Sequence, residues 1–194
     1  TLGIKRYSSI SELRGLMFLN LAVSVGGSMI FVNTIILVKS SLELSEIAFS
    51  ITMLVFGAGC IFAAIIIPYL SKEMTASRIM LAGSSLLSIV FVALAFWLIL
   101  LDFIWFVLLL AWFISGFGYT LLLTPMGRVI RKVSSADEFS QVYSAQFSLS
   151  HLCWLFMYPL SGYLMTISGG PFTLLTLALL IVCSNIIAAW HFRS

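Results

Sequence analysis

The sequence predicts an all-α membrane protein with six transmembrane helices, and two observations carry this prediction. Of the 194 residues, 61% are hydrophobic and only 9% are charged, whereas about 25% of the residues in a soluble domain are charged. The hydrophobic residues also gather into runs, and a helix needs roughly 20 apolar residues to cross a bilayer. We therefore expect an integral, multi-pass membrane protein surrounded by a lipid bilayer.

The boundaries of the helices follow from the places where charged and helix-breaking residues interrupt the apolar runs. The stretch between Arg78 and Pro125 carries a single charge, Asp102, near its middle. Its length therefore predicts two spans joined by a tight turn. Residues 16–190 form one predicted transmembrane domain. The six predicted spans are residues 16–38, 47–70, 79–101, 103–125, 139–166 and 172–190.

The last two spans carry the clearest end signals. Ser135 and, three residues later, Glu138 fit a capping box, in which each side chain bonds to the backbone N–H of the other residue. The sequence Ser-Gly-Gly-Pro at 168–171 then interrupts the chain. Pro171 suits the first turn of the following helix, because a proline lacks only an N–H that is unpaired there anyway.

Basic residues predict the orientation of the helices. The termini and loops of one side carry nine Lys and Arg residues, whereas the other side carries Lys39 alone. This bias places both termini in the cytoplasm, with 1–15 as a cytoplasmic linker segment and 191–194 as a cytoplasmic tail. The net charge of +3 is too small and too scattered to indicate a nucleic acid partner. The nine residues are Lys5, Arg6, Arg14, Lys72, Arg78, Arg128, Arg131, Lys132 and Arg193.

Polar and aromatic residues share one face on three of the predicted helices. Lipid offers no hydrogen bonds, so such residues must face other helices or an aqueous cavity. On the first and fourth helices, close packing explains the face as well as a cavity does. On the fifth, glutamine, histidine and two tyrosines exceed what packing needs, which favours a cavity or a moving interface. The predicted residues are Asn20, Ser24, Gly27 and Phe31, then Trp112 and Tyr119, then Tyr143, Gln146, Ser150, His151, Trp154 and Tyr158.

His151 is the ionisable residue that lies well inside a span, so it is the candidate for proton coupling or for contact with a solute. The alternative is a neutral imidazole that bonds to a neighbouring helix, and the sequence leaves both open. Cys153 lies about 160° round the helix from His151, so the two do not form a metal site. We expect no metal, no cofactor and no enzymatic activity, because P-loop, G-x-S-x-G and H-E-x-x-H motifs are absent from the sequence.

Local motifs resemble the C-terminal half of a major facilitator superfamily transporter. Gly116-x-Gly118, followed by Pro125 and the basic stretch GRVIRK, is similar to the tenth helix of that family and the loop after it. The stretch YPLSGYL, with Pro159-x-x-Gly162, is similar to the eleventh helix.

A third stretch, residues 68–83, lies where the family carries the loop motif G-x-L-A-D-R-x-G-R-K. It departs from that motif: Leu70 agrees, but Pro68 replaces the first glycine and Lys72 stands at the aspartate position. The departure puts in doubt any gating role for Lys72.

The resemblance implies a half built from 3+3 inverted repeats, working by alternating access to a small-molecule or ion substrate. It also implies that the first and fourth helices line a central cavity, while the second and fifth flank the boundary with an N-terminal half. Residues 19–34 and 145–162 are similar to bacterial exporters of the metal or drug resistance type. That likeness implies efflux across a bacterial inner membrane.

Two hypotheses about function follow. The first is the C-terminal half of a secondary-active transporter, working against a missing N-terminal half in the same polypeptide or in a second chain. The second is a non-transporting membrane subunit or scaffold whose polar fifth-helix face docks partner helices. The chain begins with Thr1 and no signal peptide is recognisable near it, so we expect a further segment to precede it. Six more hydrophobic spans in that segment would favour the transporter.

Overall fold

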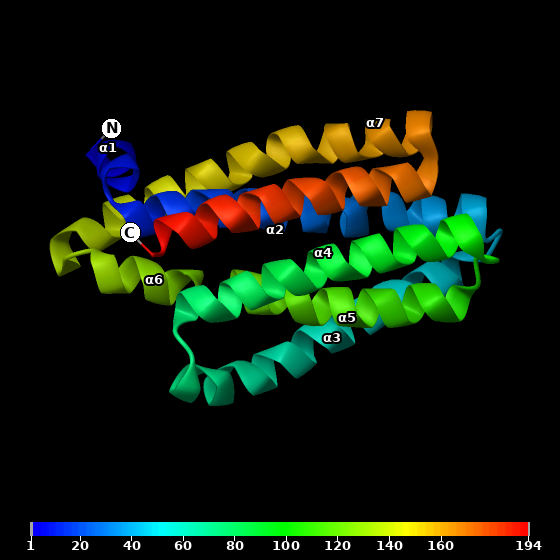
Figure 1. The fold of residues 1–194 in the computed structure, drawn as a ribbon, viewed down its shortest axis with the longest axis horizontal. Helices are drawn as coiled ribbons and strands as arrows, with labels where there is room; N and C mark the ends of the chain where they lie inside the picture. The colour runs from blue at the N-terminus through cyan, green and yellow to red at the C-terminus, as the bar shows by residue number, and fades with distance from the viewer. Residues whose placement is uncertain (1, 194) are drawn as a thin grey trace.

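The computed structural model describes residues 2–193, which form an elongated bundle of helices joined by short loops (Figure 1). The prediction of an all-α protein is confirmed, and five helices are long and apolar enough to cross a membrane. The elements are α1 (Leu2–Ser9), α2 (Ser11–Ile35) with its π-helical continuation η1 (Ile36–Ser41), α3 (Glu46–Glu73), α4 (Ala76–Leu100), α5 (Trp105–Leu123), α6 (Met126–Val133) and α7 (Ala136–His191).

Helix α7 contains two of the six predicted spans, because the chain reverses direction within it. Gly169 has φ 73° and ψ 176°, a non-helical conformation at which the helix turns back. Figure 1 shows the two antiparallel parts, which we call the first arm (136–168) and the second arm (170–191). Pro171 lies in the first turn of the second arm, as the sequence predicts.

Gly169 supplies a testable prediction about this reversal. Its positive φ is open to glycine but strained for any other residue, although no heavy atom lies within 4 Å of where a Cβ would stand. We expect Gly169→Ala to lower the free energy of unfolding by about 1–3 kcal/mol, measured by thermal unfolding in detergent. Gly170→Ala is the matched control, since its Cβ would meet Leu37 Cδ2 at an ordinary 3.5 Å. Equal stability of the two variants would contradict the prediction.

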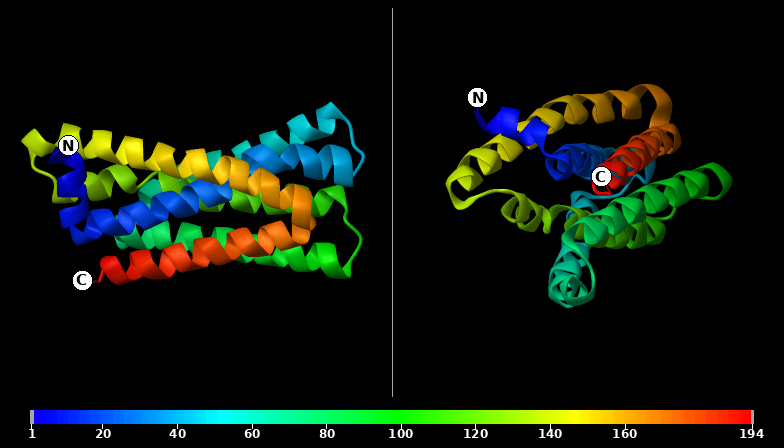
Figure 2. Two further views of the ribbon diagram at one scale, coloured as in Figure 1. Left: turned by 90° about the horizontal axis from the view of Figure 1, so that it is seen from above. Right: turned by 60° about the vertical axis from the view of Figure 1, so that its left-hand side comes forward.

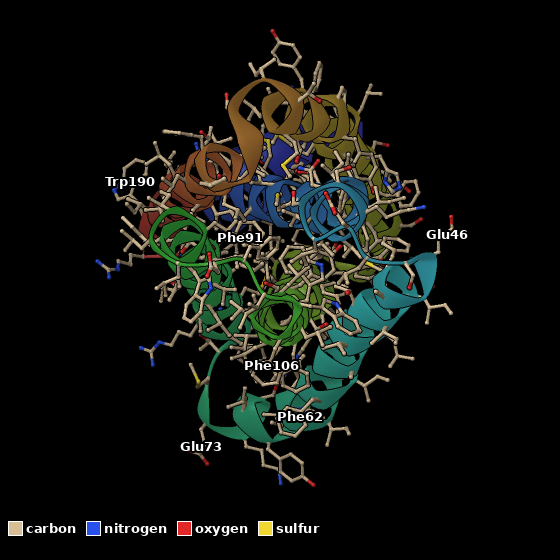
Figure 3. The ribbon with its side chains drawn as sticks, turned by 90° about the vertical axis from the view of Figure 1, so that its right-hand side faces the viewer. Glu46, Phe62, Glu73, Phe91, Phe106 and Trp190 are labelled. Atoms are coloured by element: carbon tan, nitrogen blue, oxygen red, sulfur yellow. The ribbon has the colours of Figure 1, made fainter. Side chains whose placement is uncertain are left out.

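The helices pack in a fixed set of pairs. Helix α2 packs mainly on α7, α3 packs on α5, and α4 packs on both α5 and α7. Viewed along the bundle, Phe91 of α4 lies near the centre, while Phe62 of α3 and Trp190 of α7 lie at the periphery (Figure 3). The exposed fractions agree, at 0% for Phe91, 49% for Phe62 and 67% for Trp190. The peripheral apolar side chains suit contact with lipid or with a partner protein.

The two ends of the chain lie at the same end of the bundle (Figure 2) and are more ordered than a linker and a tail. Helix α2 begins at Ser11, before the predicted residue 16, and α1 forms a separate short helix against α7. At the other terminus α7 extends through His191, which is buried and stacks on Phe18 with ring centroids 5.9 Å apart.

The predicted capping box at the start of α7 is wrong. Ser135 is the N-cap and has extended backbone angles, but its side chain makes no cap hydrogen bond. The carboxylate of Glu138 instead pairs with Arg6 of α1, with Oε1 3.4 Å from Nε. An ion pair to a neighbouring helix thus replaces the local cap and ties α1 to the first arm.

Candidate functional site

One face of the bundle carries aromatic side chains from four helices, which we call the aromatic cluster. Its centre is Phe31 of α2, whose ring centroid lies 5.8 Å from Phe56 of α3, 6.2 Å from Tyr119 of α5 and 6.1 Å from Trp154 of the first arm. Tyr158 extends the cluster along the first arm, 4.9 Å from Trp154. Since 43% of Phe31 and 40% of Tyr158 is exposed, the cluster lies at the surface of this chain.

Gly27 allows the indole of Trp154 to lie directly over α2. A Cβ at this position would overlap Cη2 of Trp154 and stand 2.7 Å from Cζ3. The lack of a side chain on Gly27 therefore sets how closely the first arm approaches α2 at the cluster. The sequence placed both residues on polar faces, and the structure brings them together.

A cleft of about 400 Å³ lies beside the aromatic cluster, between α2, α6, the end of α5 and the first arm. Trp154 and Tyr119 belong to both the cleft and the cluster. None of the described residues that line the cleft is Asp, Glu, Lys or Arg. Seven of the residues predicted from the sequence line it, namely Asn20, Tyr119, Tyr143, Gln146, Ser150, His151 and Trp154.

A chain of hydrogen bonds, which we call the amide relay, crosses the buried side of the cleft. The Tyr7 hydroxyl of α1 donates to Oε1 of Gln146, and Nε2 of Gln146 donates to Oδ1 of Asn20 at 2.6 Å. Nε2 also lies 3.4 Å from the sulfur of Met126. Burial raises the pKa of the Tyr7 phenol, so its hydroxyl stays protonated and donates. The relay links the N-terminal helix to the wall of the cleft.

His151 lies exposed in the cleft wall and bonds to its own helix. Its Nδ1 lies 2.8 Å from the carbonyl oxygen of Phe147, and its ring centroid lies 4.0 Å from that of Phe147. Because a carbonyl only accepts, Nδ1 carries the hydrogen and Nε2 is left to bind a solute or a proton. A bond to a neighbouring helix, the alternative from the sequence, is not found among the described residues.

The family of the chain is shown by comparison with known proteins. The family profile of the Major Facilitator Superfamily matches residues 16–194. The chain belongs to the major facilitator superfamily. No matching curated protein and no matching solved structure was found. The resemblance seen in the sequence is therefore confirmed at the level of the family.

Membership of the major facilitator superfamily gives the chain a general role. Members of the superfamily are membrane transporters rather than enzymes, which agrees with the expectation that this chain is not an enzyme. The chain is accordingly an integral, multi-pass part of a membrane transporter of the major facilitator type. Within residues 2–193, no three His, Cys, Asp or Glu residues gather in a way that could hold a metal ion.

Two of the predicted residues lie away from the cleft of this transporter. Ser24 is buried and donates to the carbonyl of Leu21 on its own helix at 2.9 Å. Trp112 is also buried, and its Nε1 donates to Oγ1 of Thr34 at 2.8 Å. Both therefore serve packing, which the sequence left as an equal alternative on the first and fourth helices.

Interhelical hydrogen bonds close the end of the bundle that is remote from the cleft. Nδ2 of Asn33 donates to Oγ of Ser161 at 2.8 Å, which joins α2 to the first arm. Nε1 of Trp105 donates to Oγ1 of Thr52 at 2.9 Å, which joins α5 to α3. With the Trp112 bond, these contacts hold four helices together beyond the aromatic cluster.

Sequence reasoning missed three members of this site. Phe56 carried no signal, because an aromatic residue in an apolar run looks like any other lipid or core residue. Tyr7 lies outside the predicted spans, and only the fold shows that it reaches Gln146. Asn33 could have been found, because an amide inside a span needs a partner and therefore marks a helix contact.

Proposed function

We propose that the chain is the C-terminal half of a secondary-active transporter that exports a small solute by alternating access. The single observation that carries the proposal is the common face of the cleft and the aromatic cluster. Helices α2, α3, α5 and the first arm all contribute to this face. A solute held there would contact every helix that must move for the site to change sides.

An N-terminal half is the proposed partner on this face. The exposed Tyr143, Phe147 and His151 stand beside the half-exposed Tyr158 along the first arm. Imidazole and phenol groups in hydrocarbon would lack hydrogen-bond partners, which disfavours lipid as the cover. A second six-helix half, in the same polypeptide or in another chain, would cover them and enclose the cleft.

The direction of transport is proposed from the position of the cleft. The cleft lies toward the end of the bundle that carries both termini, and the positive-inside bias assigns that end to the cytoplasm. The hydrogen bonds from Asn33 and Trp105 tie helices together at the other end. A solute would thus enter from the cytoplasm, which supports export, and the likeness to bacterial exporters supports an inner-membrane location.

The helix pairs also support the proposed 3+3 inverted repeat. If α2, α3 and α4 correspond to α5, the first arm and the second arm, then the contact of α2 with the first arm corresponds to the contact of α5 with α3. Both pairs are among the extensive contacts of the bundle. The correspondence would make α2 and α5 the central helices of the face.

Transport by the full-length protein tests the proposal. Cells that express it should accumulate less of at least one solute than control cells in a screen of metal salts and lipophilic drugs. The difference should vanish when the membrane potential and proton gradient are collapsed. The exposed aromatic face also suits a non-transporting subunit that docks partner helices. Stable co-purification with another membrane protein, without any change in accumulation, would favour that subunit and overturn the transporter.

Proton coupling by His151 gives a separate prediction. Histidine is the residue type that changes charge between about pH 5 and 8, and the other ionisable side chains lining the cleft are the phenols of Tyr119 and Tyr143. We expect His151→Gln to flatten the pH dependence of the transport rate in proteoliposomes. His191→Asn is the control, because His191 lies against Ser11 and Phe18, away from the cleft. An unchanged pH profile in His151→Gln would remove this residue from coupling.

A further inference from the structure

The amide relay ends in a donor that has no partner among the described residues. Nδ2 of Asn20 is buried and makes no hydrogen bond. Only 2% of the Asn20 side chain is exposed, and the residue lies in the wall of the cleft. A buried amide donor left unpaired is destabilising, and native proteins rarely keep one without a use. The position of the donor points to a ligand in the cleft.

The relay also determines which atom Asn20 presents. The Tyr7 hydroxyl fixes Oε1 of Gln146 as an acceptor, so Nε2 of Gln146 faces Asn20 and donates to Oδ1. The remaining atom of the Asn20 amide, Nδ2, is therefore the free end. All donors in the relay point the same way, and each bond polarises the next. Helix α1, which carries Tyr7, thus sets the orientation of a group inside the membrane domain.

The cleft wall limits the chemistry of the ligand. None of the lining residues that the structure describes carries a charge of the Asp, Glu, Lys or Arg type, so a charged solute would find no counter-charge. Tyr119, Phe147 and Trp154 line the same cleft and offer flat apolar surfaces to a ring. The wall therefore suits an uncharged, ring-containing solute that brings a hydrogen-bond acceptor for Nδ2.

We propose that Nδ2 of Asn20 binds the carbonyl oxygen of an uncharged, ring-containing solute, and that Tyr7 is the positioning residue that orients this donor. The proposal rests on the proposed transport function and names its substrate class. Because Nδ2 lies beneath the cleft wall, the ligand reaches it when an exposed wall side chain, such as Tyr143, turns aside. The competing occupant is a single buried water, which would satisfy Nδ2 without any solute.

Binding of two matched probes tests this assignment. 1-Tetralone and tetralin share a fused ring frame, and only 1-tetralone carries a carbonyl oxygen. The full-length protein in lipid nanodiscs is dialysed against each probe, and empty nanodiscs correct for partition into lipid. A neutral hydrogen bond predicts that 1-tetralone binds about fivefold more tightly than tetralin. Equal affinity would mean that water fills the position, and that result or undetectable binding of 1-tetralone would overturn the proposal.

Variants then locate the preference. Asn20→Leu keeps the volume but removes the donor, so the ratio of affinities should fall to about one. Tyr7→Phe removes one hydroxyl outside the cleft, and it should lower the ratio about twofold while tetralin binding stays unchanged. Asn185→Leu is the control, because that amide bonds Ser85 and Leu81 on α4, away from the cleft. A Tyr7→Phe ratio equal to wild type would remove Tyr7 from the assignment, even if Asn20→Leu fails to fold.

The same measurements separate failure of the subsite from failure of the proposed function. A probe preference that depends on Asn20, in a protein that moves no solute, would keep the subsite and refute transport. Transport without any probe preference would keep the transporter and refute the subsite. Binding in nanodiscs and accumulation in cells are independent measurements, so each result bears on one claim.

Discussion

Replacing Gly59 by alanine is expected to separate α3 from α5 and to lower the free energy of unfolding by about 3 kcal/mol or more. A Cβ at Gly59 would overlap the carbonyl oxygen of Phe113 and lie 3.1 Å from the backbone nitrogen of Phe117. A Cβ at Gly116 would likewise overlap the carbonyl oxygen of Phe56. The two helices thus touch backbone to backbone, and a backbone cannot turn aside as a side chain can.

Gly57→Ala is the matched control for this experiment. Gly57 lies on the same helix, and no heavy atom stands within 4 Å of its Cβ position. Its replacement should leave stability unchanged or raise it by up to about 1 kcal/mol, because alanine favours a helix over glycine. Thermal unfolding of the purified full-length protein in detergent measures both variants. If Gly59→Ala were as stable as Gly57→Ala, the close crossing of α3 and α5 would be wrong.

The composition and periodicity of the sequence were sufficient for the helices and for part of the site. Burial of an apolar run in lipid depends on the run itself, so hydropathy located the spans without knowledge of their neighbours. The polar arc of the first arm was also readable, since helical periodicity gives the angle of each side chain. Gln146 and His151 accordingly lie in the cleft wall, as their arc suggested.

Periodicity does not give the height of a residue along the bundle or the identity of its neighbour. Trp112 and Tyr119 share a face of α5, but Tyr119 joins the aromatic cluster while Trp112 bonds Thr34 of α2. Glu138 shows the same limit, because Arg6 of another helix replaced its local partner. Contacts between helices depend on the complete fold, and one sequence alone does not contain that information in readable form.

Replacing Gly27 by alanine is expected to lower the transport rate about tenfold, equivalent to about 1.4 kcal/mol in the activation barrier, while the fold is retained. The new methyl group would overlap Cη2 of Trp154, the far end of a side chain that can rotate. The backbone therefore stays in place and the indole moves away. Phe31 would lose its contact with Trp154, and the cleft would lose one of its flat walls.

Two further variants decide whether the position of Trp154 is the cause. Gly26→Ala, one residue away, meets only the side chain of Leu87 at 3.3 Å and should keep transport within about twofold of wild type. In the double variant Gly27→Ala with Trp154→Phe, the smaller ring leaves room for the methyl group and should recover part of the rate. Uptake into inverted membrane vesicles measures all three. Full transport by Gly27→Ala would show that solute movement does not depend on the indole, and the aromatic cluster would then be a packing contact alone.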